Sequence, residues 1–182
     1  PFSENEALIE YTFFTPYLTE ETIYDEQLKK YISEYLKLDT YEILNEEQGI
    51  IPMTDFPFEK DNSAKITKIG TGGGWVKAST GYSFKHTEKK ISKIIKNIKS
   101  GHKPSKDLFL RKYKFYDAIF LDVLARRNDK GEQIFSKFYQ KNSVEEIFAY
   151  LDEETPFNED LKIMFSLFDP EFIISFFRKF RL

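Results

Sequence analysis

The densest glycine cluster of the chain contains the residues best suited to bind a ligand through the backbone. Five of the eight glycines fall within residues 70–81, after a short β-like run at residues 65–70 and before a helical pattern. Residues without a Cβ atom let a ligand approach the main chain, and free N–H groups at a helix N-terminus favour an anionic phosphate or a polarised carbonyl. The spacing is neither G-x-G-x-x-G nor a Walker loop. A turn that only reverses the chain is an equal alternative.

Glu10 is the candidate for acid chemistry. Residues 7–15 alternate apolar and polar side chains of β-branched and aromatic types, which predicts a strand with Glu10 in its middle. A carboxylic acid among apolar neighbours keeps its proton, because burial penalises the ionised form, and it can then act as a general acid. The alternative is that Glu10 lies on the solvent face of an edge strand.

Composition excludes several other kinds of site. The chain has no cysteine and two histidines, which argues against thiolate nucleophiles and against zinc or histidine-rich metal sites. The acidic run at residues 152–154 is interpreted as a solvated helix end, so no metal is predicted. A net charge of −3 argues against nucleic-acid binding. The lysines of residues 85–106 are interpreted as an exposed helix face, with an anionic membrane surface as the second possibility.

The elements that must position these residues differ between the two parts of the chain. Strands are predicted at residues 7–15, 41–45, 49–53 and 65–70, with a helix at about 19–38. From Gly81 onward the pattern is helical, with breaks at residues 101–104, 128–131, 141–143, 154–156 and 169–170. We therefore predict an α/β portion at residues 1–100, with a glycine-rich loop at 70–81, and a helical C-terminal subdomain at 101–182.

Two of the predicted helices carry start signals. Ser143 followed by Glu146 forms a capping-box pattern. Asp169, Pro170 and Glu171 place a cap, a proline at the first helical position and a first-turn acid in order. Helices are therefore expected to begin at both points.

Three segments, in order, resemble the motifs of one enzyme family. Residues 70–82, GTGGGWVKASTGY, resemble the flavin-binding signature G-x-x-G-G-x-x-x-P-S-T-G-Y of the lycopene cyclase family. Residues 49–53, GIIPM, resemble its G-x-I-P-M segment, and residues 8–12, LIEYT, resemble its acidic strand motif. The chain has Lys77-Ala78 where the family commonly has His-Pro, and the family's amino-terminal G-x-G-x-x-G unit is absent. The resemblance is therefore to the C-terminal portion of the family.

The resemblance implies a fold, a reaction and a cofactor. The fold would be the C-terminal part of an FAD-dependent α/β flavoprotein, glutathione-reductase-like or hydroxylase-like. The reaction would be isomerisation of linear lycopene end groups to β-rings in carotenoid biosynthesis, with Glu10 as proton donor. Reduced FAD, with NADPH as reductant, would stabilise the cation without net redox turnover. The implied flavin-binding residues are Gly70, Thr71, Gly72, Gly73, Gly74, Ser79, Thr80, Gly81 and Tyr82.

Aromatic rings beside the motifs are candidates for substrate binding. Phe56, Phe58 and Trp75 flank two of the family segments, and cation–π attraction to such rings is worth about 0.5 to 2 kcal/mol each. Core packing is the alternative role for any one of them.

The implied substrate also predicts where the protein works. Lycopene dissolves in membranes, so the protein would be cytoplasmic and peripherally membrane-bound. The C-terminal segment has aromatic residues at helical spacing and cations near its end, which suits an interface. These residues are Phe172, Ile173, Phe176, Phe177, Phe180, Arg178, Lys179 and Arg181. A core helix closing the helical half is the alternative.

Two other functions compete with a cyclase. The first is a related FAD-dependent hydroxylase or polyprenyl reductase, in which Glu10 has no protonation role. The second is a non-catalytic helical module that binds a membrane or an apolar partner.

Overall fold

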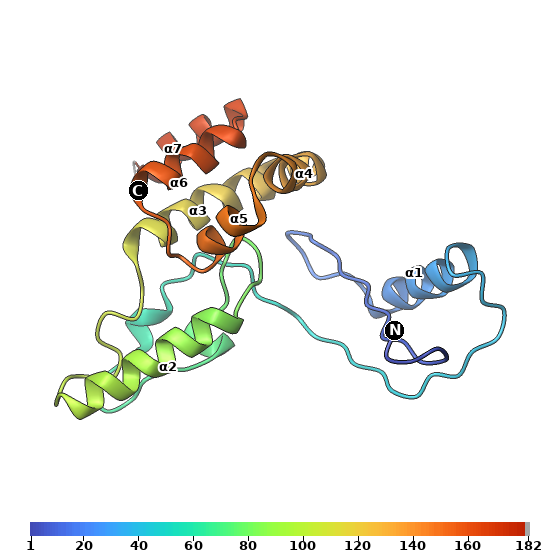
Figure 1. Cartoon of the computed structure of the whole chain (residues 1–182), viewed down its shortest axis with the longest axis horizontal. Helices are drawn as coiled ribbons and strands as arrows, with labels where there is room; N and C mark the ends of the chain where they lie inside the picture. Colours follow the sequence, from blue (N-terminus) through green and yellow to red (C-terminus); the bar gives the residue numbers. More distant parts are fainter. Residues whose placement is uncertain (181–182) are drawn as a thin grey trace. The chain divides into compact units, whose positions relative to one another are not determined.

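The chain forms two compact units, Pro1–Gly49 and Ile50–Leu182. A computed structural model describes residues 1–180, and its helices are labelled in Figure 1. The predicted boundary at residue 100 separates a ligand-binding portion from a helical subdomain, whereas the observed boundary separates two compact units. The predicted boundary stays a prediction.

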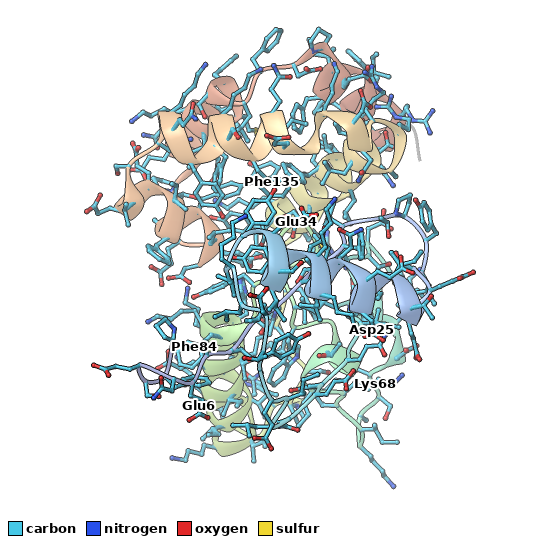
Figure 2. All side chains as sticks on the ribbon, turned by 90° about the vertical axis from the view of Figure 1, so that its right-hand side faces the viewer. Glu6, Asp25, Glu34, Lys68, Phe84 and Phe135 are labelled. Atoms are coloured by element: carbon cyan, nitrogen blue, oxygen red, sulfur yellow. The ribbon has the colours of Figure 1, made fainter. Side chains whose placement is uncertain are left out.

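The first unit is built around α1, Glu21–Glu34. An extended segment packs its rings on this helix: Phe13 meets Tyr24 edge to face with ring centroids 4.9 Å apart. Asp25 and Glu34, labelled in Figure 2, are exposed on α1. The helix ends four residues earlier than predicted.

The second unit contains six α-helices among the described residues. They are α2 Phe84–Lys99, α3 Arg111–Arg126, α4 Gly131–Lys141, α5 Val144–Leu151, α6 Phe157–Ser166 and α7 Pro170–Phe180. Short 3₁₀ helices are η1 Phe58–Asp61, η2 Thr71–Gly73 and η3 Asn128–Lys130. Helices α4, α5 and α6 share a core made of Phe138, Ile147, Leu151, Ile163 and Leu167. Helix α7 runs beside α3 (Figure 1).

Both predicted helix starts are confirmed. The Ser143 side chain accepts a hydrogen bond from the Glu146 N–H, and the Glu146 side chain accepts one from the Ser143 N–H. At α7, the Asp169 carboxylate accepts a hydrogen bond from the Glu171 N–H at 3.0 Å. Each cap satisfies a helix N–H that has no partner within its own helix.

The predicted α/β fold is wrong for residues 1–180, which contain helices and no strand. Residues 7–15, 41–45, 49–53 and 65–70 lie outside strands, although their composition favours β structure. A strand exists only when a neighbour completes its hydrogen-bond ladder, and alternation does not supply that neighbour. Large apolar side chains therefore stay exposed here, among them Leu8, Ile43, Leu44, Ile50 and Ile66.

Helix α2 buries a polar side and exposes an apolar one. His86 and Asn97 are buried, whereas Phe84, labelled in Figure 2, is 77% exposed at its first residue. The Asn97 amide donates to the carbonyl oxygens of Pro104 at 3.0 Å and Lys106 at 2.8 Å, which holds the loop after the helix. The lysine face predicted to be exposed is exposed only in part, because Lys89, Lys90 and Lys93 are half-buried.

Helix α7 has a buried side and an exposed apolar side. Ser175 is fully buried, and its hydroxyl donates to Asp122 of α3 at 2.7 Å. Ile173, Phe177 and Phe180 are exposed on the outer side, and Arg181 lies outside the described residues. Among the described helices, none is long and apolar enough to cross a membrane.

Candidate functional site

A partly open cavity of about 60 Å³ in the second unit is the candidate site. Segments distant in sequence line it: the stretch before and within η1, the glycine turn, α2, the start of α3, and Glu153. Predicted site residues on its wall are Phe56, Phe58, Thr71, Gly74 and Trp75. The structure thus places two of the three family-like segments around one cavity.

Several glycines of the turn are required by the backbone conformation and the close packing of the turn itself. Gly70 and Gly74 have φ of +61° and +69°, which glycine adopts at little cost. A Cβ at Gly73 would lie 2.5 Å from the Lys68 carbonyl oxygen, and one at Gly74 would lie 2.5 Å from the Phe58 ring. These two glycines are therefore required by contacts inside the protein.

Gly72 is required neither by a positive φ nor by a close contact at the Cβ position. Its φ is ordinary, it is exposed, and a Cβ there would meet no atom within 4 Å. Open space over Gly72 leaves room for an outside group to approach the backbone.

The second half of the motif is a closed turn. The Lys77 N–H donates to the Tyr82 carbonyl at 2.7 Å, and the Gly81 N–H donates to the Lys77 carbonyl at 2.8 Å. Gly81 has φ of +75°. Ser79 and Thr80 lie within this turn, and the Ser79 side chain points inward to α3.

A buried ion pair joins this turn to α3. The Lys77 side chain is fully buried, and its ammonium lies 3.1 Å from the Asp117 carboxylate and 3.5 Å from Glu153. The Ser79 hydroxyl donates to Asp117 at 2.6 Å. The Lys77 ammonium also faces the Tyr113 ring at 5.3 Å. Burial raises the pKa of Asp117, although Lys77 and Ser79 act in the opposite direction.

His86 is a buried neutral imidazole. Its Nε2 lies 2.7 Å from the Leu151 carbonyl oxygen, which can only accept, so Nε2 carries the hydrogen. Burial, together with the nearby Lys90 and Lys77, lowers its pKa to about 4. Its Nδ1 is 4.0 Å from Glu153, and at neutral pH this contact is not an ion pair.

Glu10 belongs to the first unit, whereas the residues that line the cavity belong to the second. Its side chain is exposed, and its carboxylate accepts a hydrogen bond from the Thr12 hydroxyl at 2.9 Å. Leu8, expected to flank it in an apolar setting, is also exposed. The role of Glu10 as an acid stays a prediction.

The sequence analysis identified none of the titratable side chains that line the cavity as site residues; they are Asp55, Glu59, Lys77, His86, Lys90, Lys114, Asp117 and Glu153. A signal for Asp117 was present: it shares a stripe of α3 with Tyr113, Phe120 and Leu124, at helical spacing. A carboxylate on an apolar stripe indicates a buried partner. Nothing in the sequence identified Lys77 as that partner.

Comparison with known proteins gives one match. A family model described as lycopene cyclase protein matches residues 1–179, which includes residues from both compact units. No curated protein and no solved structure matches the chain.

The burial of neutral His86 predicts a pH-dependent stability. An unfolded chain takes up a proton on this ring near pH 6.5, whereas the folded protein does so only near pH 4. The free energy of unfolding should therefore fall by about 2 kcal/mol between pH 7.5 and pH 5 because of this group. Urea unfolding of the wild type and His86→Gln measures it, since glutamine still donates to Leu151 but does not titrate. His102→Gln is the matched control; equal pH profiles for wild type and His86→Gln would contradict the assignment.

The buried ion pair predicts an asymmetry between its two partners. Lys77→Met leaves Asp117 buried without its cation and should lower the free energy of unfolding by about 3–5 kcal/mol. Asp117→Asn should cost less, because Lys77 keeps Glu153 at 3.5 Å. Denaturant unfolding measures both, with the exposed Lys96→Met on α2 as control. A Lys77→Met variant as stable as Lys96→Met would show that the pair contributes nothing.

Proposed function

The chain belongs to the lycopene cyclase family, and from that premise we propose that it converts linear end groups of lycopene into β-rings. The observation that carries the proposal is the family match over residues 1–179, which supports a carotenoid cyclase function. The reaction adds a proton to a carbon–carbon double bond, forms a carbocation that closes the ring, and loses a proton from a neighbouring carbon. Reactant and product are isomers, so the reaction needs no net oxidant or reductant.

Glu10 is the proposed proton donor. What supports this role is its place in the family-like acidic strand motif, and its exposed carboxyl has no ion-pair partner within 4.0 Å among the described residues. A hydrocarbon chain that covers the carboxyl removes it from water and favours its neutral, proton-donating form. Tyr11 replaces a second acid of the motif, so Glu10 carries this chemistry by itself.

The glycine turn is the proposed flavin contact. The exposed backbone of Thr71 and Gly72 is open to a flat ring, whereas Gly73 and Ser79 are turned inward and position this edge. Reduced FAD, kept reduced by NADPH, would supply an electron-rich ring that stabilises positive charge during cyclisation. Phe56 and Phe58, whose rings meet at 5.0 Å, and Trp75 form an aromatic wall beside the turn, which supports a substrate role for them.

The proposed substrate also sets the cellular location. A protein that takes lycopene from a bilayer must dock on that bilayer, and we place it at the cytoplasmic face of a membrane. The outer face of α7, with Ile173, Phe177 and Phe180 exposed, is a suitable docking surface because aromatic and aliphatic side chains enter the boundary between headgroups and acyl chains.

The acid assignment predicts the effect of Glu10→Gln. The amide keeps the shape of the side chain and has no proton to donate, so cyclisation of lycopene should fall by about 100-fold or more. The assay incubates the protein with lycopene-loaded liposomes, FAD and NADPH and separates the pigments by chromatography. Glu6→Gln, a nearby exposed acid labelled in Figure 2, is the matched control. Unchanged cyclisation by Glu10→Gln would contradict the assignment, and a wild type that makes no ring product would contradict the function.

The flavin contact predicts the effect of Gly72→Val. The added side chain meets no protein atom within 4 Å, so the fold should be retained, while flavin affinity should fall by at least about tenfold because the ring loses its approach to the backbone. Fluorescence titration with FAD measures affinity, and circular dichroism checks the fold. Gly73→Val is a poorer probe, because it collides with the Lys68 carbonyl. Ala64→Val, at an exposed position outside the turn, is the control; equal flavin affinity in both variants would refute the contact.

A further inference from the structure

The outer side of helix α2 carries a stripe of apolar side chains that are between 46% and 77% exposed. The side chains of this α2 stripe recur at intervals of seven, four and three residues, which places them on one face of the helix. They are Phe84, Ile91, Ile95 and Ile98. The buried residues His86 and Asn97 lie on the opposite face. A surface helix usually buries its apolar face, so packing inside the protein does not account for the α2 stripe.

Positive charge gathers beside the α2 stripe. Residues 84–106 contain eight lysines and one carboxylate, Glu88, in a chain whose net charge is −3. Several of these lysines share an open groove along the helix with Glu88 and Ser92. They are Lys85, Lys89, Lys93 and Lys96. Lys85 pairs with Glu88 and Lys89 with Glu154, whereas Lys93, Lys96 and Lys99 have no carboxylate within 4.0 Å in residues 1–180.

The loop after α2 adds further cations at the end of the helix. The Asn97 amide donates to the carbonyl oxygens of Pro104 and Lys106, so the loop folds back beside the last turn of α2. Lys103 and Lys106 are exposed in this loop. The buried side of α2 therefore holds a basic loop in place, although the same helix exposes its isoleucines.

An anionic bilayer is the partner whose chemistry matches both the apolar side chains and the lysines. A helix that lies in a membrane interface buries its apolar face at the boundary between headgroups and acyl chains, and its lysines remain at the headgroups. Anionic lipids attract such lysines. Nucleic acid would contact the lysines but leave the isoleucines in water, and a neutral apolar partner would leave the lysines uncompensated.

We propose that α2 docks the second unit on anionic membranes, with the α2 stripe at the acyl boundary and Lys93, Lys96 and Lys99 among anionic headgroups. The side of α2 that carries His86 and Asn97 stays packed on the protein, so docking needs no rearrangement of the helix.

This surface goes beyond the proposed cyclase function. It is separate from the outer face of α7, and binding through it requires neither lycopene, flavin nor Glu10. A protein that makes no ring product would leave this proposal standing, and a protein that ignores anionic lipids would leave the cyclase reaction standing.

Vesicle sedimentation of the intact chain tests the lipid preference. Vesicles of phosphatidylcholine with phosphatidylserine should bind the protein at least about tenfold more tightly than phosphatidylcholine alone, and high salt should abolish the difference. Lys96→Gln combined with Lys99→Gln should lower the affinity for the anionic vesicles by about tenfold or more, since each lysine near the surface contributes to the attraction. Lys29→Gln combined with Lys30→Gln removes the same charge from exposed positions of α1 and is the matched control.

A fluorescent probe tests whether the α2 stripe enters the bilayer. The chain has no cysteine, so an Ile95→Cys variant labelled with nitrobenzoxadiazole carries the probe at one position. Its emission should brighten and shift to shorter wavelength when phosphatidylserine vesicles are added, because the probe leaves water. Gln140→Cys, at an exposed position of α4, is the control and should not respond.

Four results would overturn the proposal. The first is equal binding, or no binding, to the two kinds of vesicle. The second is a loss of affinity in the α1 variant as large as in the α2 variant. The third is an unchanged probe at residue 95 in vesicle-bound protein, which would place the docking surface elsewhere. The fourth is a spectral shift with soluble polyglutamate as large as with vesicles, which would indicate an acidic polypeptide as the partner.

Discussion

The ion pair between Lys77 and Asp117 is the contact on which the second unit depends. Both side chains are withdrawn from water, and an isolated buried charge costs several kcal/mol unless an opposite charge and hydrogen bonds compensate it. Lys77 follows the glycine turn and Asp117 lies in the middle of α3, so the two charges can be satisfied only when turn and helix meet. The cavity is lined from both of these elements, and its walls therefore exist because this pair forms.

Other polar side chains along α3 also pair with segments that are distant in sequence. The Tyr113 hydroxyl donates to the Thr155 carbonyl at 3.0 Å, one turn before Asp117. Further along, Arg126 pairs with Glu171 of α7 at 2.7 Å. Each buried polar group of α3 thus selects a different segment as its partner. Apolar contacts alone would tolerate several packings of these short helices, whereas paired polar groups that must all be satisfied at once favour one arrangement.

Two glycines of the motif pack against the protein interior, and one faces open space. Gly73 and Gly74 permit close packing on Lys68 and Phe58, and Lys77 anchors the following residues. Gly72 alone among the three consecutive glycines faces open space at ordinary φ. The motif therefore has one open edge on a closely packed base, and the lysine that replaces the family's usual histidine belongs to the base.

The sequence by itself determined the family, the helical second half, the breaks between its helices and the caps at Ser143 and Asp169. These features are local, since periodicity and capping depend on residues within a few positions of one another. The sequence also led to strands at residues 7–15, 41–45, 49–53 and 65–70, which the structure does not contain, because a strand depends on a partner that alternation does not specify. The charged cavity was decided by tertiary structure alone. Lys77 and Asp117 lie 40 residues apart. Only folding removes both side chains from water, and each buried charge then needs the other as its ion-pair partner.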